Sequence, residues 1–420
     1  MADNYPYHSP MYAGQMLKPP HPLARLAYGL AMHINPNNHA LDGGRASSQM
    51  EKEAVADLAA MFGWKRHLGH LTSGGTMANL EALWVAGQLR PGQTIVASTQ
   101  AHYTHTRISK VLQLPCETIG CDDRGRLDPG LLEKRLKKGG VGTVVVTIGT
   151  TATGSIDPLP EVIDLQKQYN FRIHADAAYG GYYMVASSLE REARRSYDCL
   201  RHVDSLVIDP HKHGLQPYGC GCVLFRDPAV GRLYKHDSPY TYFSSQELHL
   251  GEISLECSRA GAAAVGLWAT HRLLPPVRGG AFADNLDTCR HAALALFERI
   301  TADERFVPGM PPQLDIVTWI PRAASPAAAS RLSRQIFAAA AKLGLHLALA
   351  ELPTRFFGAP TAGAPARKPR SGHEPTVTCL RSVLMKPEHF DAIPAIWSTL
   401  DRATRRALAQ PAILSRRRQK

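Results

Sequence analysis

The chain has 420 residues, of which 44% are hydrophobic and 20% charged, and its formal net charge is +12. This length suits two or three packed units of an ordinary globular protein and excludes a small single-core domain. No apolar run approaches the roughly 20 residues of a membrane span, and the N-terminus lacks a basic start followed by an apolar core. We therefore expect neither a membrane helix nor a secretory signal.

The first half of the chain alternates between helix and strand patterns. Residues 1–50, rich in Pro, Asn, His and Gly, predict an irregular arm with one helix over Leu23–Met32. Strands are predicted, in chain order, at Thr94–Ser98, Thr143–Ile148, Phe171–Ala175 and Ser205–Ile208. Helices are predicted at Glu51–Phe62, His102–Leu114, Pro129–Lys138 and Leu159–Tyr169. This alternation implies helical crossovers and a mostly parallel, buried sheet.

After Gly261 the pattern changes to that of a smaller α+β unit. Helices are predicted from Gly261 and over 282–300, Pro326–Leu343 and Pro387–Arg406, and strands at Asp315–Ile320 and Thr376–Met385. We therefore divide the chain into an arm (1–50), a large domain (51–275), a small C-terminal domain (276–405) and a basic tail (406–420). No nucleic-acid-binding motif accompanies the tail, so we expect it to be solvated rather than bound to nucleic acid.

The eight cysteines are spread along the chain rather than arranged as a framework. Cys220 and Cys222 are too close together for a metal knuckle and have no second pair at suitable spacing. We expect free thiols, no metal site and a cytoplasmic location, since the cytosol is reducing.

The stretch LTSGGTMANLEALW places two glycines before Thr76 and a helix after it. A helix N-terminus presents unpaired N–H groups, glycine allows an anion to approach the backbone, and a threonine hydroxyl adds a donor. Gly75 and Thr76 are therefore candidate phosphate ligands, with a turn that only caps the helix as an equal alternative.

Two further polar side chains follow strand ends. His102, in STQAHYTH, is placed to stack on a flat cofactor, although a single histidine is more often structural. Asp176, in RIHADAAYGGYY, ends an apolar strand, where an unpaired carboxylate would be costly. Its partner is either the protonated ring nitrogen of a cofactor or a neighbouring Arg or His.

Lys212 ends another strand, in SLVIDPHKHGLQPYG, between two histidines. A deprotonated lysine forms an imine with an aldehyde, and His211 beside it can donate to a phosphate. A glycine turn, a histidine, an aspartate and a lysine thus follow one another at strand ends. Together they offer partners for the phosphate, ring face, ring nitrogen and aldehyde of pyridoxal 5′-phosphate.

The motifs TSGGTMAN, QAHYTH, GTTATGSIDP, HADAAYGG and DPHKHG together resemble the group II pyridoxal-phosphate decarboxylases, from about Pro20 to Pro387. This resemblance implies an α/β fold of type I, like that of the aspartate aminotransferases. It also implies a homodimer whose active site is shared between chains, and a small-molecule amino acid as the substrate.

The resemblance assigns roles to individual side chains. Lys212 would hold the cofactor aldehyde, Asp176 would pair with the ring nitrogen, and His102 would stack on the ring. Ala178 would pack on the other face of the ring, and Thr151 would lie near its phenolic oxygen.

Gly75, Thr76 and His211 would bind the cofactor phosphate. Many members of the family have Asn where this chain has Asp209. An acid so near a phosphate would repel it unless the acid faces the ring edge or pairs with a cation.

The resemblance also places candidate substrate groups. Arg381, in TVTCLRSVLM, would bind the α-carboxylate. Tyr240 or Tyr242, in the family's mobile catalytic loop, would protonate the carbanion, with His249 as a third candidate. Four residues of the arm are candidates for contact with the distal end of a substrate, with a polar loop as the alternative: Asn35, Asn37, Asn38 and His39.

The predicted reaction is decarboxylation of an L-amino acid, aromatic or acidic, to the amine and carbon dioxide. Alternatives with the same cofactor are an aldehyde synthase and a carbon–carbon lyase. A third alternative is a non-catalytic protein that acts through its basic tail.

Overall fold

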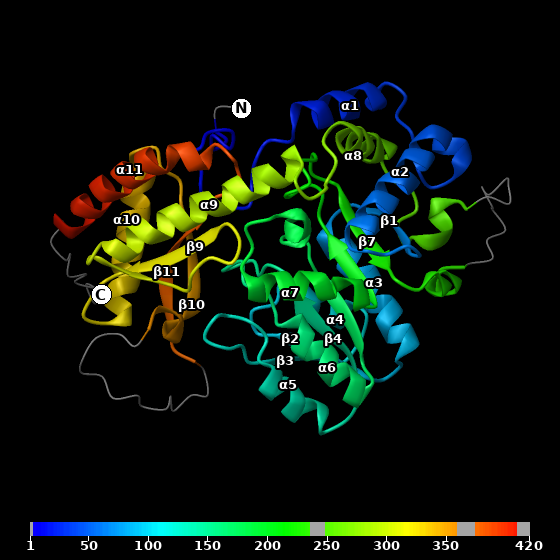
Figure 1. Ribbon diagram of the computed structural model, residues 1–420, viewed down its shortest axis with the longest axis horizontal. Helices are drawn as coiled ribbons and strands as arrows, with labels where there is room; N and C mark the ends of the chain where they lie inside the picture. Colours follow the sequence, from blue (N-terminus) through cyan, green and yellow to red (C-terminus); the bar gives the residue numbers. More distant parts are fainter. Residues whose placement is uncertain (1–2, 236–247, 359–373, 410–420) are drawn as a thin grey trace, which may run out of the picture. The chain divides into compact units, whose positions relative to one another are not determined.

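The computed structural model describes residues 3–235, 248–358 and 374–409. The chain divides into two compact units: residues 18–288 form the large unit, and residues 1–17 with 289–420 form the small unit (Figure 1). The division falls inside α9 (Ala281–Ala302). Residues 18–50, expected as part of a separate arm, thus group with the large unit, and residues 1–17 group with the small one.

The large unit is built on a seven-stranded sheet in the order β1-β7-β6-β5-β4-β2-β3. Its strands are β1 (Leu68–Thr72), β2 (Thr94–Ser98), β3 (Cys116–Ile119), β4 (Val141–Thr147), β5 (Arg172–Asp176), β6 (Ser205–Ile208) and β7 (Gly221–Phe225). Strand β7 runs antiparallel to both of its neighbours, β1 and β6, and the other four strand pairs are parallel, so the sheet is mostly parallel, as predicted. All seven residues of β4 are buried, as expected for a strand covered on both faces.

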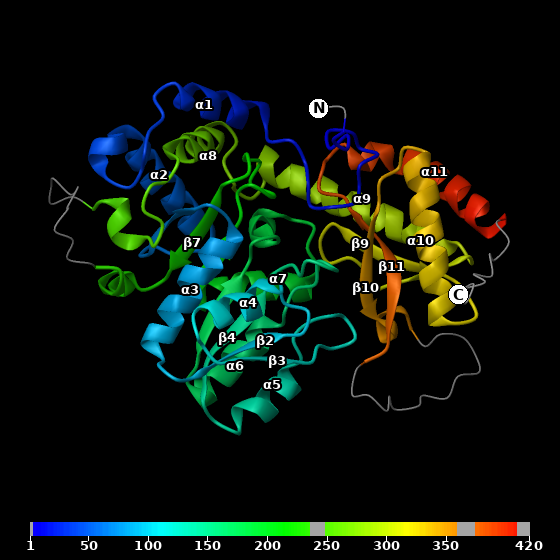
Figure 2. The ribbon, with the colours of Figure 1, turned by 180° about the vertical axis from the view of Figure 1, so that it is seen from behind.

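Helices connect and cover these strands (Figures 1 and 2). They are α1 (Pro22–Met32), α2 (Leu41–Met61), α3 (Gly75–Leu89), α4 (Thr104–Val111), α5 (Pro129–Leu136), α6 (Leu159–Tyr169), α7 (Arg191–Cys199) and α8 (Gly261–Leu273). Short 3₁₀ turns lie at η1 (Gly181–Val185), η2 (Leu200–His202), η3 (Pro228–Leu233) and η4 (Leu250–Ile253). Helix α3 packs across β1, β4, β5, β6 and β7, which fixes its N-terminus beside the ends of the parallel strands.

The small unit carries a four-stranded antiparallel sheet in the order β10-β11-β9-β8. Its elements are β8 (Phe306–Pro308), β9 (Ile316–Pro321), α10 (Pro326–Lys342), β10 (Ala348–Pro353), η5 (Thr354–Phe357), β11 (Thr376–Val383) and α11 (His389–Ala409). The N-terminal segment joins it: Ala13 N donates to His346 O at 2.9 Å, and Val383 N donates to Ala13 O at 2.8 Å. Trp319 and Leu380 lie in its core.

Several predicted elements coincide with observed ones, and others were missed. The predicted bounds of β2, β6 and α6 match those observed, whereas β1, β3, β7 and α7 were not predicted. The predicted helix from His102 begins only at Thr104, because His102 Nδ1 accepts a hydrogen bond from Thr104 N and forms the preceding turn. Within the described ranges, no helix has the length and apolar character needed to cross a bilayer.

Candidate active site

A cavity of about 300 Å³ opens at the carboxyl ends of the parallel strands of the large unit. All eight predicted cofactor-binding residues line it: Gly75, Thr76, His102, Thr151, Asp176, Ala178, His211 and Lys212. Asp209 and Asn79 also lie on its wall. Ligands of open α/β sheets bind at this end of the strands, so its position fits a binding site.

The glycine turn before α3 forms one wall of the cavity. Gly74 has φ of +155°, a conformation that side chains disfavour. A Cβ on Gly75 would lie 2.6 and 2.9 Å from the two carboxylate oxygens of Asp209, so any side chain there would have to displace Asp209. The turn therefore brings the free N–H groups of the α3 N-terminus to the cavity.

Lys212 and Asp209 form an ion pair on the same wall. Lys212 Nζ lies 2.9 Å from Asp209 Oδ2, and His211 Nε2 lies 3.6 Å from the same oxygen. Burial works to lower the pKa of Lys212, but the Asp209 carboxylate outweighs it, and the pKa is raised. Asp209, which stands where many members of the resembled family have Asn, thus has a cationic partner in Lys212. His211 Nδ1 donates to Cys220 O at 2.8 Å, which fixes its ring.

Asp176 lies at the end of β5 and is 5% exposed. Its Oδ2 accepts from His105 Nε2 at 2.8 Å and lies 3.5 Å from Asn79 Nδ2, and its Oδ1 accepts from Ala178 N at 3.2 Å. Burial disfavours the carboxylate, but the hydrogen bond from His105 and the nearby positive charge, Lys212 included, together outweigh it and hold the pKa of Asp176 below its ordinary range. Of the two partners predicted for this acid, the histidine is therefore present as His105, and Asp176 also lines the cavity.

The partners of Asp176 were missed in the sequence. His105 follows His102 by three residues and lies in the first turn of α4, just after the turn that His102 forms. His174 precedes Asp176 by two residues in β5 and therefore faces the same side of the sheet. His174 Nε2 bonds Asn79 Oδ1 at 2.8 Å, and burial lowers the pKa of His174 to about 3. The spacings from His102 to His105 and from His174 to Asp176 were the signals in the sequence that could have identified these partners.

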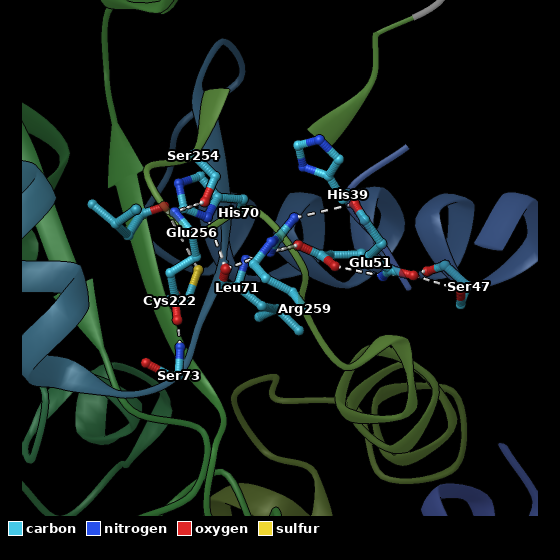
Figure 3. Close-up of polar contacts among 12 residues, drawn as sticks. His39, Ser47, Glu51, His70, Leu71, Ser73, Cys222, Ser254, Glu256 and Arg259 are labelled. Atoms are coloured by element: carbon cyan, nitrogen blue, oxygen red, sulfur yellow. Dashed lines mark hydrogen bonds and ion pairs between the residues drawn. The ribbon is translucent and has the colours of Figure 1, made fainter. Parts of the chain in front are cut away.

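A buried ion pair supports the strand that leads into the glycine turn. Arg259 Nη1 lies 2.7 Å from Glu51 Oε1 and 2.5 Å from Leu71 O, and Glu51 also accepts from Leu71 N at 2.9 Å (Figure 3). Farther along, Ser73 N donates to Glu256 Oε2 at 2.9 Å. Residues from two separate segments, α2 and the stretch before α8, thus hold β1 and the cavity rim. This network has no recognisable sequence signal, because its members lie far apart in the chain.

The remaining predicted residues lie elsewhere. Tyr240 and Tyr242 fall outside the described residues. His249 is buried and accepts from Leu41 N at 3.1 Å at the start of η4, away from the cavity lining. Asn35 is exposed, and His39 packs against the backbone of Gly251.

Among the other predicted residues, Asn38 is buried, with its Nδ2 2.6 Å from Glu51 Oε2, and Asn37 Oδ1 accepts from Arg259 N at 3.0 Å. Both are therefore engaged in structural contacts. Arg381 belongs to the small unit, is 4% exposed, and reaches Gly14 O and Gln15 Oε1 at 3.4 Å each. In the described part of the chain, no group of three or more His, Cys, Asp or Glu side chains is arranged to hold a metal ion.

A family model described as the pyridoxal-dependent decarboxylase conserved domain matches residues 7–318. An L-tyrosine decarboxylase of Enterococcus faecium is 27% identical over 375 residues, covering 65% of this chain and 61% of the relative. A probable L-tyrosine/L-aspartate decarboxylase of Methanocella arvoryzae is 29% identical over 303 residues, covering 71% of this chain and 76% of the relative. The chain thus spans less than two thirds of the length of the Enterococcus relative.

Solved structures share the fold. The crystal structure of mouse CSAD in apo form matches with a TM-score of 0.79 at 21% identity, covering 95% of this chain and 85% of that one. The crystal structure of Oryza sativa TDC with PLP and tryptamine matches with a TM-score of 0.80 at 19% identity, covering 95% and 84%. These matches confirm the predicted α/β fold of type I.

Proposed function

This chain belongs to the pyridoxal-dependent decarboxylase family, and we propose that it decarboxylates an L-amino acid to the corresponding amine. One observation carries the proposal: a lysine, an acid at a strand end and a glycine-capped helix N-terminus line a single cavity. No simpler binding role needs all three, because a phosphate site requires neither an ion-paired lysine nor a buried carboxylate.

The cavity wall fits pyridoxal phosphate. The α3 N-terminus and Thr76 suit its phosphate, Lys212 suits its aldehyde, and Asp176 suits its ring nitrogen. Two buried oxygens on the lining, Asp209 Oδ1 and Thr147 Oγ1, have no hydrogen-bond partner among the described residues. Buried polar atoms of this kind are normally satisfied, so a polar ligand fits beside them. When bound, the cofactor supplies an electron sink for the pair left behind as carbon dioxide departs.

The side chains of the cavity perform the other tasks. Asp209 holds Lys212 Nζ at the wall of the cavity, since Lys212 Nζ and Asp209 Oδ2 lie 2.9 Å apart. Asp176 provides a negative charge for the ring nitrogen. Burial lowers the pKa of His102, so its imidazole is suited to stack as a neutral ring.

Three predicted roles remain proposals for the rest of the cavity. His211 is proposed as a phosphate ligand, Ala178 as the contact on the second ring face, and Thr151 as a neighbour of the phenolic oxygen. All three line the cavity, which supports these assignments.

The substrate groups also remain proposals. Arg381 is proposed to bind the α-carboxylate, and Tyr240 or Tyr242 to protonate the carbanion. Asn35 and His39 are proposed to contact the substrate across a dimer. Because the relatives are named as tyrosine or tyrosine/aspartate decarboxylases, aromatic and acidic amino acids are the first substrates to test.

We also propose that the chain acts in the cytoplasm and as a homodimer. Four apolar side chains in and just after α1 support the homodimer, because each is at least 60% exposed: Leu26, Leu30, Met32 and Ile34. Clustered exposed apolar surface is typical of an interface.

The test compares Lys212→Ala with Lys137→Ala, whose side chain is exposed and paired with Glu133. With added pyridoxal phosphate, Lys212→Ala should lose both the visible absorption of the lysine-bound cofactor and carbon dioxide release, and Lys137→Ala should retain both. Screening amino acids for carbon dioxide identifies the substrate. Aldehyde with ammonia among the products would indicate an aldehyde synthase, and a parent chain that stays colourless would refute the proposal.

A further inference from the structure

A buried histidine lies directly behind the carboxylate of the cavity. His105 is 0% exposed, and its Nε2 lies 2.8 Å from Asp176 Oδ2. Its Nδ1 has no hydrogen-bond partner among the described residues. Because an ionised carboxylate can only accept hydrogen bonds, Nε2 carries a hydrogen and donates it to Asp176.

The second neighbour of the same oxygen is more distant. Asn79 Nδ2 lies 3.5 Å from Asp176 Oδ2, at the outer limit of a hydrogen bond. The orientation of this amide is fixed, because its Oδ1 accepts from His174 Nε2 at 2.8 Å, and His174 Nδ1 in turn bonds Ser205 Oγ at 2.9 Å. This relay from β6 supports Asn79, but the short donor to Asp176 Oδ2 is His105.

We infer that His105 is a positioning residue for decarboxylation, which fixes the rotamer of Asp176 and keeps its carboxylate ionised for the cofactor ring nitrogen. This inference rests on the proposed function, since it assigns His105 a task only if Asp176 serves the ring. His105 would touch neither cofactor nor substrate and would act through Asp176 alone.

The alternative is that the contact only stabilises the fold. The same unit offers a matched control, because His70 Nε2 lies 2.9 Å from Glu81 Oε2, and both side chains are buried. This second histidine–carboxylate pair does not line the cavity. Loss of either histidine removes one short hydrogen bond from a buried carboxylate, so both changes are expected to lower stability.

The experiment compares His105→Leu, His105→Gln and His70→Leu in the full chain. The readouts are the dissociation constant for pyridoxal phosphate, the absorption spectrum of the bound cofactor, thermal unfolding of the cofactor-free chain, and kcat separately from KM. His105→Leu should weaken cofactor binding about tenfold or more, because a hydrogen bond to a charged group is lost. It should also change the absorption spectrum of the bound cofactor. The decrease in kcat should be larger than any change in KM.

The control variants decide the interpretation. His105→Gln, whose amide N–H can still reach Asp176, should bind the cofactor within about threefold of the parent. His70→Leu should lower the unfolding temperature without altering the spectrum. Should His105→Leu fail to fold, His105→Asn, whose amide is too short to reach Asp176, replaces it.

Two outcomes would overturn the inference, and they differ from failure of the proposed function. A His105→Leu chain with the parent's spectrum and affinity but lowered stability would show a purely structural contact. An equal loss in His105→Gln would show that the N–H donor is not what matters. A parent chain that binds no cofactor would instead refute the proposed function itself.

Discussion

At the scale of single residues, the cavity depends on the close approach of Gly75 and Asp209 as much as on charge. Gly75 carries no side chain, and the space a Cβ would occupy is taken by the Asp209 carboxylate. This contact allows Asp209 to reach Lys212 while the turn still leads into α3. The glycine of the TSGGTMAN motif thus has two tasks, to present N–H groups and to admit an acid.

Gly75→Ala should therefore displace Asp209 and weaken cofactor binding, and it should lower the free energy of unfolding by about 1–3 kcal/mol through overpacking. Gly29→Ala is the control, because a Cβ at this position in α1 meets no atom within 4 Å. Its alanine should instead raise the free energy of unfolding by about 0.5–1 kcal/mol. Urea unfolding with a cofactor titration measures both, and a Gly75→Ala chain indistinguishable from the parent would contradict the packing argument.

At the scale of elements, β1 is held by side chains from distant segments. Glu51 of α2 and Arg259, just before α8, meet at Leu71, two residues before the cavity wall begins at Ser73 (Figure 3). Both charged side chains are almost fully buried, at 2% and 8% exposure. A buried charge that loses its partner is costly, so the two depend on each other.

Arg259→Met or Glu51→Gln alone should lower the free energy of unfolding by about 3–5 kcal/mol. The double variant should lose less than the sum of the two, because no single charge then stays buried. Glu117→Gln, which breaks a pair whose carboxylate is 49% exposed, should cost about 1 kcal/mol or less. Denaturant unfolding of the parent and the four variants measures this, and strict additivity of the two single changes would show that the pair is not coupled.

At the scale of the whole molecule, buried titratable groups make stability depend on pH. Burial lowers the pKa of His174 to about 3 and raises the pKa of Asp157 to about 7. Below pH 6.5 the unfolded chain binds a proton at His174 that the folded chain does not, so this histidine reduces stability as pH falls toward 3. Asp157 has the opposite effect: between pH 7 and 3.8 the folded chain binds a proton there that the unfolded chain does not, so stability rises as pH falls. The contribution of His174 is therefore measured as the difference between parent and variant.

In the parent, His174 should lower the free energy of unfolding by up to about 1.4 kcal/mol per pH unit as pH falls from 6 to 4, and His174→Gln should remove this decrease. Unfolding free energies of parent and variant across that range measure the difference in slope. Above pH 7 the two slopes should agree, which serves as the internal control. Equal slopes at acidic pH would show that His174 is protonated in the folded chain.

The exposed apolar residues of α1 allow the proposed homodimer to be tested. Leu26 and Leu30 are 63% and 60% exposed, so replacing both with lysine places charge on the surface proposed for the homodimer. The double variant should sediment as a monomer, while Val111→Lys, at a position that is 69% exposed in α4, should leave the dimer intact. A parent chain that sediments as a monomer would refute the homodimer.

The sequence by itself determined the α/β class, several elements to the residue, and the residues that meet at the cavity. It could do so because the strands are continuous buried apolar runs, and because parallel strands place their carboxyl ends together. Strand β7 was missed because GCGCVLF follows a turn and lacks a clear period. Only the tertiary structure decided that Asp209 pairs with Lys212, that His105 bonds Asp176, and that Glu51 meets Arg259 across 208 positions. Such contacts depend on distances between side chains from separate segments, which local patterns do not encode.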